Sequence, residues 1–164
     1  MYNWLVYLHV FAAIVFFYSH GASGLVALRL RTERDLVRMR AMMETYASNV
    51  GFGLLYGSLL LLLVTGIISG FIAKWWHMAW IWISLGLLIA ITVAMYAIGT
   101  GYYTQVRKAI GMEFMEGSKP HPPLPPESPE VIAAFLAKSP AMLLFTIGFG
   151  GLAVILWLMM FKPF

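Results

Sequence analysis

Residues 2–30 read YNWLVYLHVFAAIVFFYSHGASGLVALRL, a run without a charged side chain before Arg29. About 20 apolar residues are enough for a helix to cross the hydrocarbon core of a bilayer, so the run predicts a membrane-spanning helix. It is too long for a removable signal peptide, and it lacks the basic start and the small-residue cleavage site of one. We therefore expect residues 2–30 to remain in the protein as its first span.

The whole chain is far more apolar than a water-soluble domain. Of its 164 residues, 61% are hydrophobic and 11% are charged, whereas soluble domains have about 45–50% apolar and 25% charged residues. Four stretches are long enough to cross a bilayer, at about 2–30, 47–73, 78–104 and 140–161. This pattern predicts an all-α fold, an antiparallel four-helix bundle in a membrane that forms one domain over residues 1–164.

The basic residues are distributed unevenly between the two ends of the predicted bundle. Only Lys74 and Lys162 fall on the side of the termini, and the other nine of the eleven Lys and Arg residues lie in the two long connections. Cytoplasmic loops carry such an excess, so we expect both long connections in the cytoplasm and both termini outside. All seven acidic residues share the cytoplasmic side, so the charge gives no support for a nucleic-acid partner.

Each long connection contains a predicted short helix. In the first, Thr32 followed by Asp35 suggests a capping-box start for an amphipathic helix. In the second, the proline-rich stretch 117–129 favours an extended form, and Ser128 begins a helix that runs to Lys138. We expect both short helices to lie at the inner membrane surface; alternatively, the first is a helical extension of the second span.

Glycine pairs mark the second predicted span as a packing helix. Gly53 and Gly57 are four residues apart, as are Gly66 and Gly70, so each pair lies on one helix face. Small residues let helices approach closely where no hydrophobic force drives them together. We expect these faces to contact neighbouring helices, other membrane subunits or a second copy of the chain. The tryptophan-rich link 74–77 predicts a tight hairpin at the membrane–water interface.

Two histidines lie inside the first span. His9 and His20 are eleven residues apart, which places them within about 20° of one helix face and about 16 Å apart along the axis. An ionisable residue inside a membrane helix indicates a functional site, and neutral imidazole ligates haem iron and other metals. We expect His9 and His20 to bind haem b, with copper at His9, His20 and His77 as the weaker alternative. Each ring could instead hydrogen-bond a neighbouring helix.

Several kinds of chemistry are absent from the sequence. No cysteine is present, which excludes disulfides, thiolate metal sites and iron–sulfur clusters. The four predicted spans have no acidic or basic residue in their interiors, which argues against ion-coupled transport. No phosphate loop and no nucleophile motif is found. Catalysis is therefore not expected without a bound redox cofactor.

A family resemblance supports the assignment of His9. The features are the pair Leu8-His9, the stretch Gly24-Leu-Val-Ala-Leu-Arg29, the basic connection into a glycine-rich second span and the tryptophan-flanked third span. Together they resemble a bacterial superfamily of copper-resistance-D-type proteins, a four-helix haem-containing protoporphyrinogen oxidase and uncharacterised relatives. The oxidase branch implies that His9 ligates haem b. It also implies a ligand in the third helix, where Trp80-Ile-Trp82-Ile-Ser84 has none.

These observations lead to three hypotheses about function. The first is a bacterial inner-membrane protein that binds haem b, or copper, for electron transfer or cofactor handling. The second is a cofactor-free accessory subunit of a larger respiratory or photosynthetic complex, whose glycine faces are subunit contacts. The third is a small-molecule permease lined by hydroxyl side chains.

Overall fold

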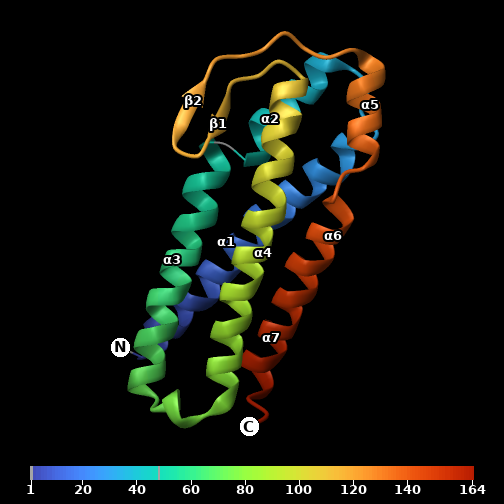
Figure 1. Ribbon diagram of the computed structural model, residues 1–164. Coiled ribbons are helices and arrows are strands. Elements are labelled where there is room, and N and C mark those ends of the chain that lie inside the picture. Colours follow the sequence, from blue (N-terminus) through green and yellow to red (C-terminus); the bar gives the residue numbers. More distant parts are fainter. Residues whose placement is uncertain (1, 48) are drawn as a thin grey trace.

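The computed structural model describes residues 2–47 and 49–164, without the side chains of residues 47 and 49–52. Met1, which belongs to the predicted domain, and Ser48, which belongs to the predicted span 47–73, lie outside the described residues. Helices make up most of the structure (Figure 1). Four helical stretches are long and apolar enough to cross a membrane, at Tyr2–Leu30, Gly53–Ile72, Ala79–Ala109 and Pro129–Phe161. The all-α fold predicted from the sequence is confirmed.

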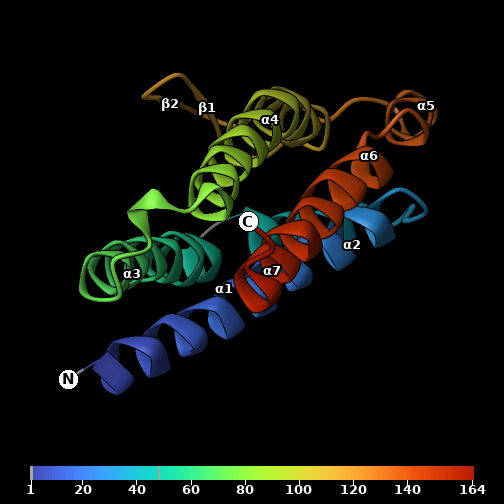
Figure 2. The same cartoon turned by 90° about the horizontal axis from the view of Figure 1, so that it is seen from below.

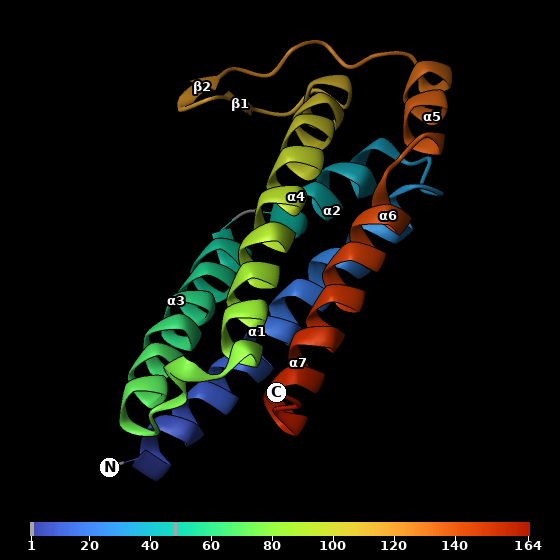
Figure 3. The same cartoon turned by 60° about the horizontal axis from the view of Figure 1, so that its bottom comes forward.

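The four long stretches run up and down as neighbouring antiparallel rods (Figure 1). Their elements are α1 (Tyr2–Leu30), α3 (Asn49–Ile72), α4 (Ala79–Ala109), and α6 (Ala141–Phe145) with the π turn η2 (Thr146–Gly150) and α7 (Gly151–Phe161). We call one end the polar end, where α2 (Leu36–Ala47), strands β1 (Phe114–Glu116) and β2 (Lys119–His121) and α5 (Pro129–Ala137) lie. The other end, with the 3₁₀ turn η1 (Trp75–His77) and both termini, is called the turn end (Figure 3).

The rods pack chiefly as two pairs. Helix α3 lies along α1, α7 lies along α4, and α6 joins the pairs by contacting α1 (Figure 2). Phe16, Leu88 and Leu152 form a small core midway along the rods. The largest core lies at the polar end, where Leu30, Met43 and other apolar residues of α1, α2, α4, α5 and α6 bury one another. The short helices therefore do more than connect the rods, because they close this core.

Helix α2 begins later than the sequence pattern predicts. Its N-cap is Asp35, whose Oδ1 accepts a hydrogen bond from the Arg38 N–H at 2.8 Å. A capping side chain satisfies one of the amides that have no partner in the first turn of a helix. The Thr32 hydroxyl instead donates to the Arg29 carbonyl at the end of α1, 3.1 Å away. The predicted start at Thr32 is therefore wrong, because this hydroxyl closes the preceding helix.

The second connection contains more structure than its sequence suggested. Helix α4 continues to Ala109, beyond the predicted end at 104, and Gly111 in the left-handed region (φ +69°) lets the chain turn away. An antiparallel hairpin then pairs Phe114 with His121, an element not predicted. The helix expected after Ser128 is confirmed: the Ser128 side chain accepts a hydrogen bond from the first turn of α5.

The turn end is tied together by its tryptophans and the C-terminal residues. The Lys162 ammonium lies 4.0 Å from the centre of the Trp75 ring, a cation–π contact. The backbone N–H of Trp80 donates to the Phe164 carbonyl at 3.3 Å, and Trp80 is 1% exposed. The short link from α3 to α4, which the sequence predicts as a tight hairpin, is thereby attached to the end of α7.

The cap at Asp35 generates a testable prediction. Replacing a capping aspartate by alanine costs about 1 kcal/mol, so Asp35→Ala should speed amide hydrogen exchange in α2 about fivefold. Thr32→Ala is the matched control, because its hydroxyl bonds outside α2, and it should leave exchange in α2 nearly unchanged. Equal effects of the two variants would contradict the assignment of the cap.

Candidate functional site

His9 joins α1 to α3 in the middle of their contact. Its Nδ1 lies 3.0 Å from the Leu62 carbonyl oxygen and 3.1 Å from Thr65 Oγ1. The ring lies against Gly66, where a Cβ atom would stand 3.0 Å from His9 Cε1. Glycine at this position therefore lets the imidazole reach the backbone of α3.

The hydrogen bonds of His9 determine its tautomer. Thr65 donates its own hydroxyl proton to the Leu61 carbonyl at 2.7 Å, so toward His9 the Thr65 oxygen acts as an acceptor. The Leu62 carbonyl can only accept. Both contacts therefore require a proton on Nδ1, which leaves the lone pair on Nε2. Metal-ligating histidines commonly donate the other ring N–H to a carbonyl in this way, although the same bonds also suit an imidazole that joins two helices.

His20 occupies a different environment, next to the π turn of the fourth rod. Its ring stacks on Phe16 with centroids 6.0 Å apart and lies 5.4 Å from the Phe149 ring. A Cβ atom at Gly148 would lie 2.2 Å from His20 Nε2, so this nitrogen is directed at the backbone of η2. Single π turns are rare and are frequent at functional sites. Here the turn lets Gly148 accommodate the imidazole.

The histidines named by the sequence do not form a shared centre. No group of three His, Cys, Asp or Glu side chains that could hold a metal is found among the described residues. His77 is exposed at the turn end. A copper site built jointly from His9, His20 and His77 therefore does not fit this arrangement. The Nε2 atom of His20 lies against Gly148, and haem binding by His20 stays a prediction.

The outer face of α3 is a candidate site that the sequence could only partly define. Gly66 receives His9, and Gly70 lies against the side chains of Trp76 and Ile81. A Cβ atom at Gly53 or Gly57, in contrast, would meet nothing within 4 Å. The sequence shows two equivalent pairs, and only the structure shows that one is filled from within the chain while the other faces outward.

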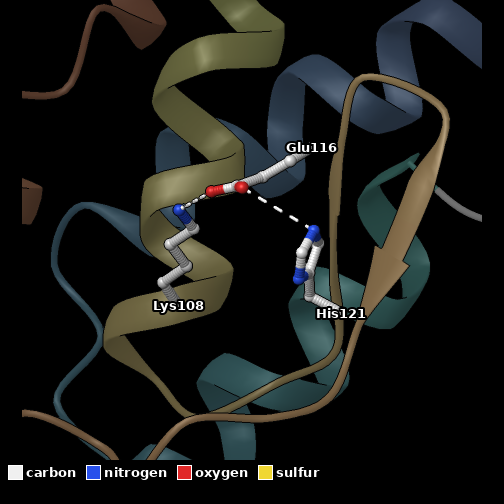
Figure 4. Close-up of polar contacts among 3 residues, drawn as sticks. All are labelled: Lys108, Glu116 and His121. Atoms are coloured by element: carbon white, nitrogen blue, oxygen red, sulfur yellow. Dashed lines mark hydrogen bonds and ion pairs between the residues drawn. The ribbon is translucent and has the colours of Figure 1, made fainter.

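A third group of polar residues lies on the hairpin at the polar end. Glu116 forms an ion pair with Lys108 of α4, and its other oxygen is 3.6 Å from His121 Nε2 (Figure 4). Phe114 stacks on the His121 ring at 5.2 Å and lies 4.6 Å from the Lys108 ammonium. The Lys108 hydrogen bond and charge lower the pKa of Glu116. The group attaches the hairpin to the end of α4.

We compared the chain with protein-family models, curated proteins and solved structures, and none of the three comparisons found a match. The function is therefore inferred from the geometry of the chain itself. Three features are available for this inference: the paired His9, the enclosed His20 and the open glycine face of α3.

The contact between His20 and Gly148 can be tested by adding one methyl group. Gly148→Ala should destabilise the protein by about 1–3 kcal/mol, since overpacking forces neighbouring groups to move. Gly150→Ala, in the same π turn but with nothing within 4 Å of the added atom, is the matched control and should lack this penalty. The measurement is unfolding of the detergent-solubilised protein.

A double variant separates the steric effect from a backbone effect in the same experiment. In His20→Ala the space for a Gly148 methyl is vacated, so adding Gly148→Ala should cost much less than in the wild type. Equal costs in both backgrounds would show that His20 does not lie on Gly148.

The ion pair on the hairpin predicts a pH dependence. Because Lys108 lowers the pKa of Glu116, the pair stabilises the hairpin above the unfolded-state pKa of glutamate, and this contribution is lost as the pH falls through the lower folded-state value. Lys108→Gln should raise the midpoint of the Glu116 titration, followed by the NMR shift of its carboxyl carbon. Lys119→Gln, across the hairpin from Glu116, is the control and should leave this midpoint unchanged. Equal changes of the midpoint in the two variants would contradict the pairing of Lys108 with Glu116.

Proposed function

We propose that the chain is a four-span integral membrane protein that acts as a cofactor-free subunit, packing against a membrane-spanning partner through the outer face of α3. The polar end faces the cytoplasm in this proposal, and the turn end with both termini lies outside. The partner surface consists of Gly53, Gly57, Leu60 and Val64, and we call these four residues the α3 face.

The surface of the rods supports placement in a bilayer. Large apolar side chains are exposed on all four rods, for example Ile14 (62%), Leu60 (63%), Val93 (61%) and Leu156 (53%). Water-soluble monomers rarely expose continuous apolar surface of this kind. Nine of the eleven cationic residues lie at or beside the polar end, which agrees with the excess of Lys and Arg on cytoplasmic loops.

The single observation that supports a partner is the contrast between the two glycine pairs of α3. Gly66 and Gly70 each receive a side chain from a neighbouring element, whereas among the described residues nothing lies within 4 Å of a Cβ atom placed at Gly53 or Gly57. Lipid tails cover larger side chains equally well, so lipid alone does not require glycine at these positions. A closely packed second helix does require small residues there, because they let the two backbones approach closely.

The neighbouring residues make the α3 face continuous. Leu60 is 63% exposed and Val64 is 44% exposed, and both follow Gly57 at the helical spacing that keeps them on one side. The opposite side of α3, with Ser58, Leu62 and Thr65, faces α1. A partner helix lying along the α3 face would therefore not disturb the contact between α1 and α3.

A second candidate function is binding of haem b through His9, and one observation favours it. The hydrogen bonds of His9 leave the lone pair on Nε2, the tautomer of an axial ligand. A bound haem would supply one-electron transfer. A hollow near the turn end and one at the polar end both lack a histidine in their lining, and we rank haem binding below the partner-binding function.

The proposed contact predicts the effect of placing a large side chain at a glycine of the α3 face. Gly57→Leu should abolish assembly with the partner, because a bulky side chain holds the two helices apart. Gly86→Leu is the matched control, since Gly86 lies on α4 and also has nothing within 4 Å. The measurement is the size and subunit composition of the complex extracted from the native membrane in mild detergent.

Crosslinking and absorption complete the test. The chain has no cysteine, so Leu60→Cys introduces a unique crosslinking position, which should join the chain to its partner or to a second copy. A chain that stays monomeric and uncrosslinked in both wild type and Gly57→Leu would overturn the proposal. A Soret band in the purified protein that is lost in His9→Ala would favour haem binding instead.

A further inference from the structure

A hollow at the turn end lies between α3 and α4. It has a volume of about 460 Å³ and is lined by Ile67 and Phe71 of α3, Trp76 of η1 and Trp82 of α4, without polar surface. Sites for small ligands usually have volumes of about 300–1,000 Å³. The hollow is therefore large enough for part of an apolar molecule.

The aromatic walls of the hollow hold one another in place. The Trp76 and Trp82 rings lie 5.3 Å apart, and Phe71 lies 5.2 Å from Trp76. The Trp82 indole N–H donates to the Trp76 carbonyl at 3.0 Å. Because these contacts exist before anything binds, an occupant would find a preformed site and would pay little ordering cost.

A lysine lies on the turn that connects two walls of the hollow. Lys74 is on the turn between Phe71 and Trp76, and its backbone N–H donates to the Phe71 carbonyl at 3.3 Å. The turn end has one other lysine, Lys162, and its ammonium lies over the Trp75 ring. No carboxylate pairs with Lys74 in the described ranges 2–47 and 49–164, where the ion pairs of Glu116 lie at the polar end.

We propose that this hollow binds one anionic phospholipid, with an acyl chain between Phe71 and Trp82 and the phosphate beside Lys74. The inference uses the membrane orientation given above. Ile67 and Phe71 lie on the same side of α3 as Leu60 and Val64, nearer the turn end, so the test must separate the lipid from the partner. Tryptophans gather at the level of the lipid head groups, so the apolar hollow lies next to the start of the acyl chains. Lys74 supplies the charge that favours an anionic head group over a zwitterionic one.

The test is native mass spectrometry of the full-length protein released from micelles that contain equal amounts of phosphatidylglycerol and phosphatidylcholine. We expect one retained phosphatidylglycerol per chain. Ile67→Trp fills the hollow and should lower this retention about tenfold, because the indole takes the place of buried methylene groups of the acyl chain. Ile68→Trp is the matched control, because Ile67 and Ile68 are both 41% exposed and only Ile67 lines the hollow.

Head-group recognition is tested with the two lysines of the turn end. Lys74→Gln should lower the preference for phosphatidylglycerol about fivefold, as expected for one lysine near an anionic head group. Lys162→Gln removes the lysine that lies over Trp75 and should leave the preference unchanged.

Three results would overturn the proposal. The first is equal lipid retention in Ile67→Trp and Ile68→Trp, and the second is equal retention of the two lipids by the wild type. The third is a loss of the crosslinked assembly in Ile67→Trp with lipid retention intact, which would assign the hollow to the protein partner. A wild-type chain that retains the lipid but forms no crosslinked assembly would overturn the proposed function alone.

Discussion

The close approach of α1 and α3 is the contact on which the rest of the structure depends. His9 bonds the Leu62 carbonyl beside Gly66, where a Cβ atom would crowd the imidazole at 3.0 Å. A buried imidazole without such a partner would be costly, since a polar group in an apolar environment must be hydrogen-bonded. The bond also sets the rotation of α3 about its own axis. That rotation directs Ser58 and Thr65 toward α1 and leaves Gly53 and Gly57 on the outside.

The contact between α1 and the fourth rod also places a histidine against a glycine, here in a π turn. His20 lies on Gly148, and the π turn of residues Thr146–Gly150 interrupts the fourth rod at that level. In both contacts a histidine of α1 lies on a glycine of another rod. The two imidazoles that suggested a shared cofactor stripe are therefore each enclosed by a different helix pair. Packing therefore explains why both imidazoles lie on one face of α1. This face contacts α3 through His9 and the fourth rod through His20.

The two ends of the molecule are stabilised by different forces. At the polar end, α2 and α5 close an apolar core around residues such as Met43 and Ile110, which are fully buried. At the turn end, indole rings and the Lys162 ammonium pack around the short link between α3 and α4. Charged side chains are concentrated at the first end and aromatic ones at the second. An excess of Lys and Arg at one end is the pattern that orients membrane proteins.

The sequence by itself determined the four apolar helices, the hairpin at Trp75, the helix after Ser128 and the separation of charge between the two ends. These features follow from local composition and spacing, because a helix needs only its own backbone bonds and a long apolar run. The tertiary structure alone decided which glycines are filled and where His9 and His20 find their contacts. Such choices depend on neighbours far apart in the chain, for example Leu62 beside His9, and no local pattern encodes them.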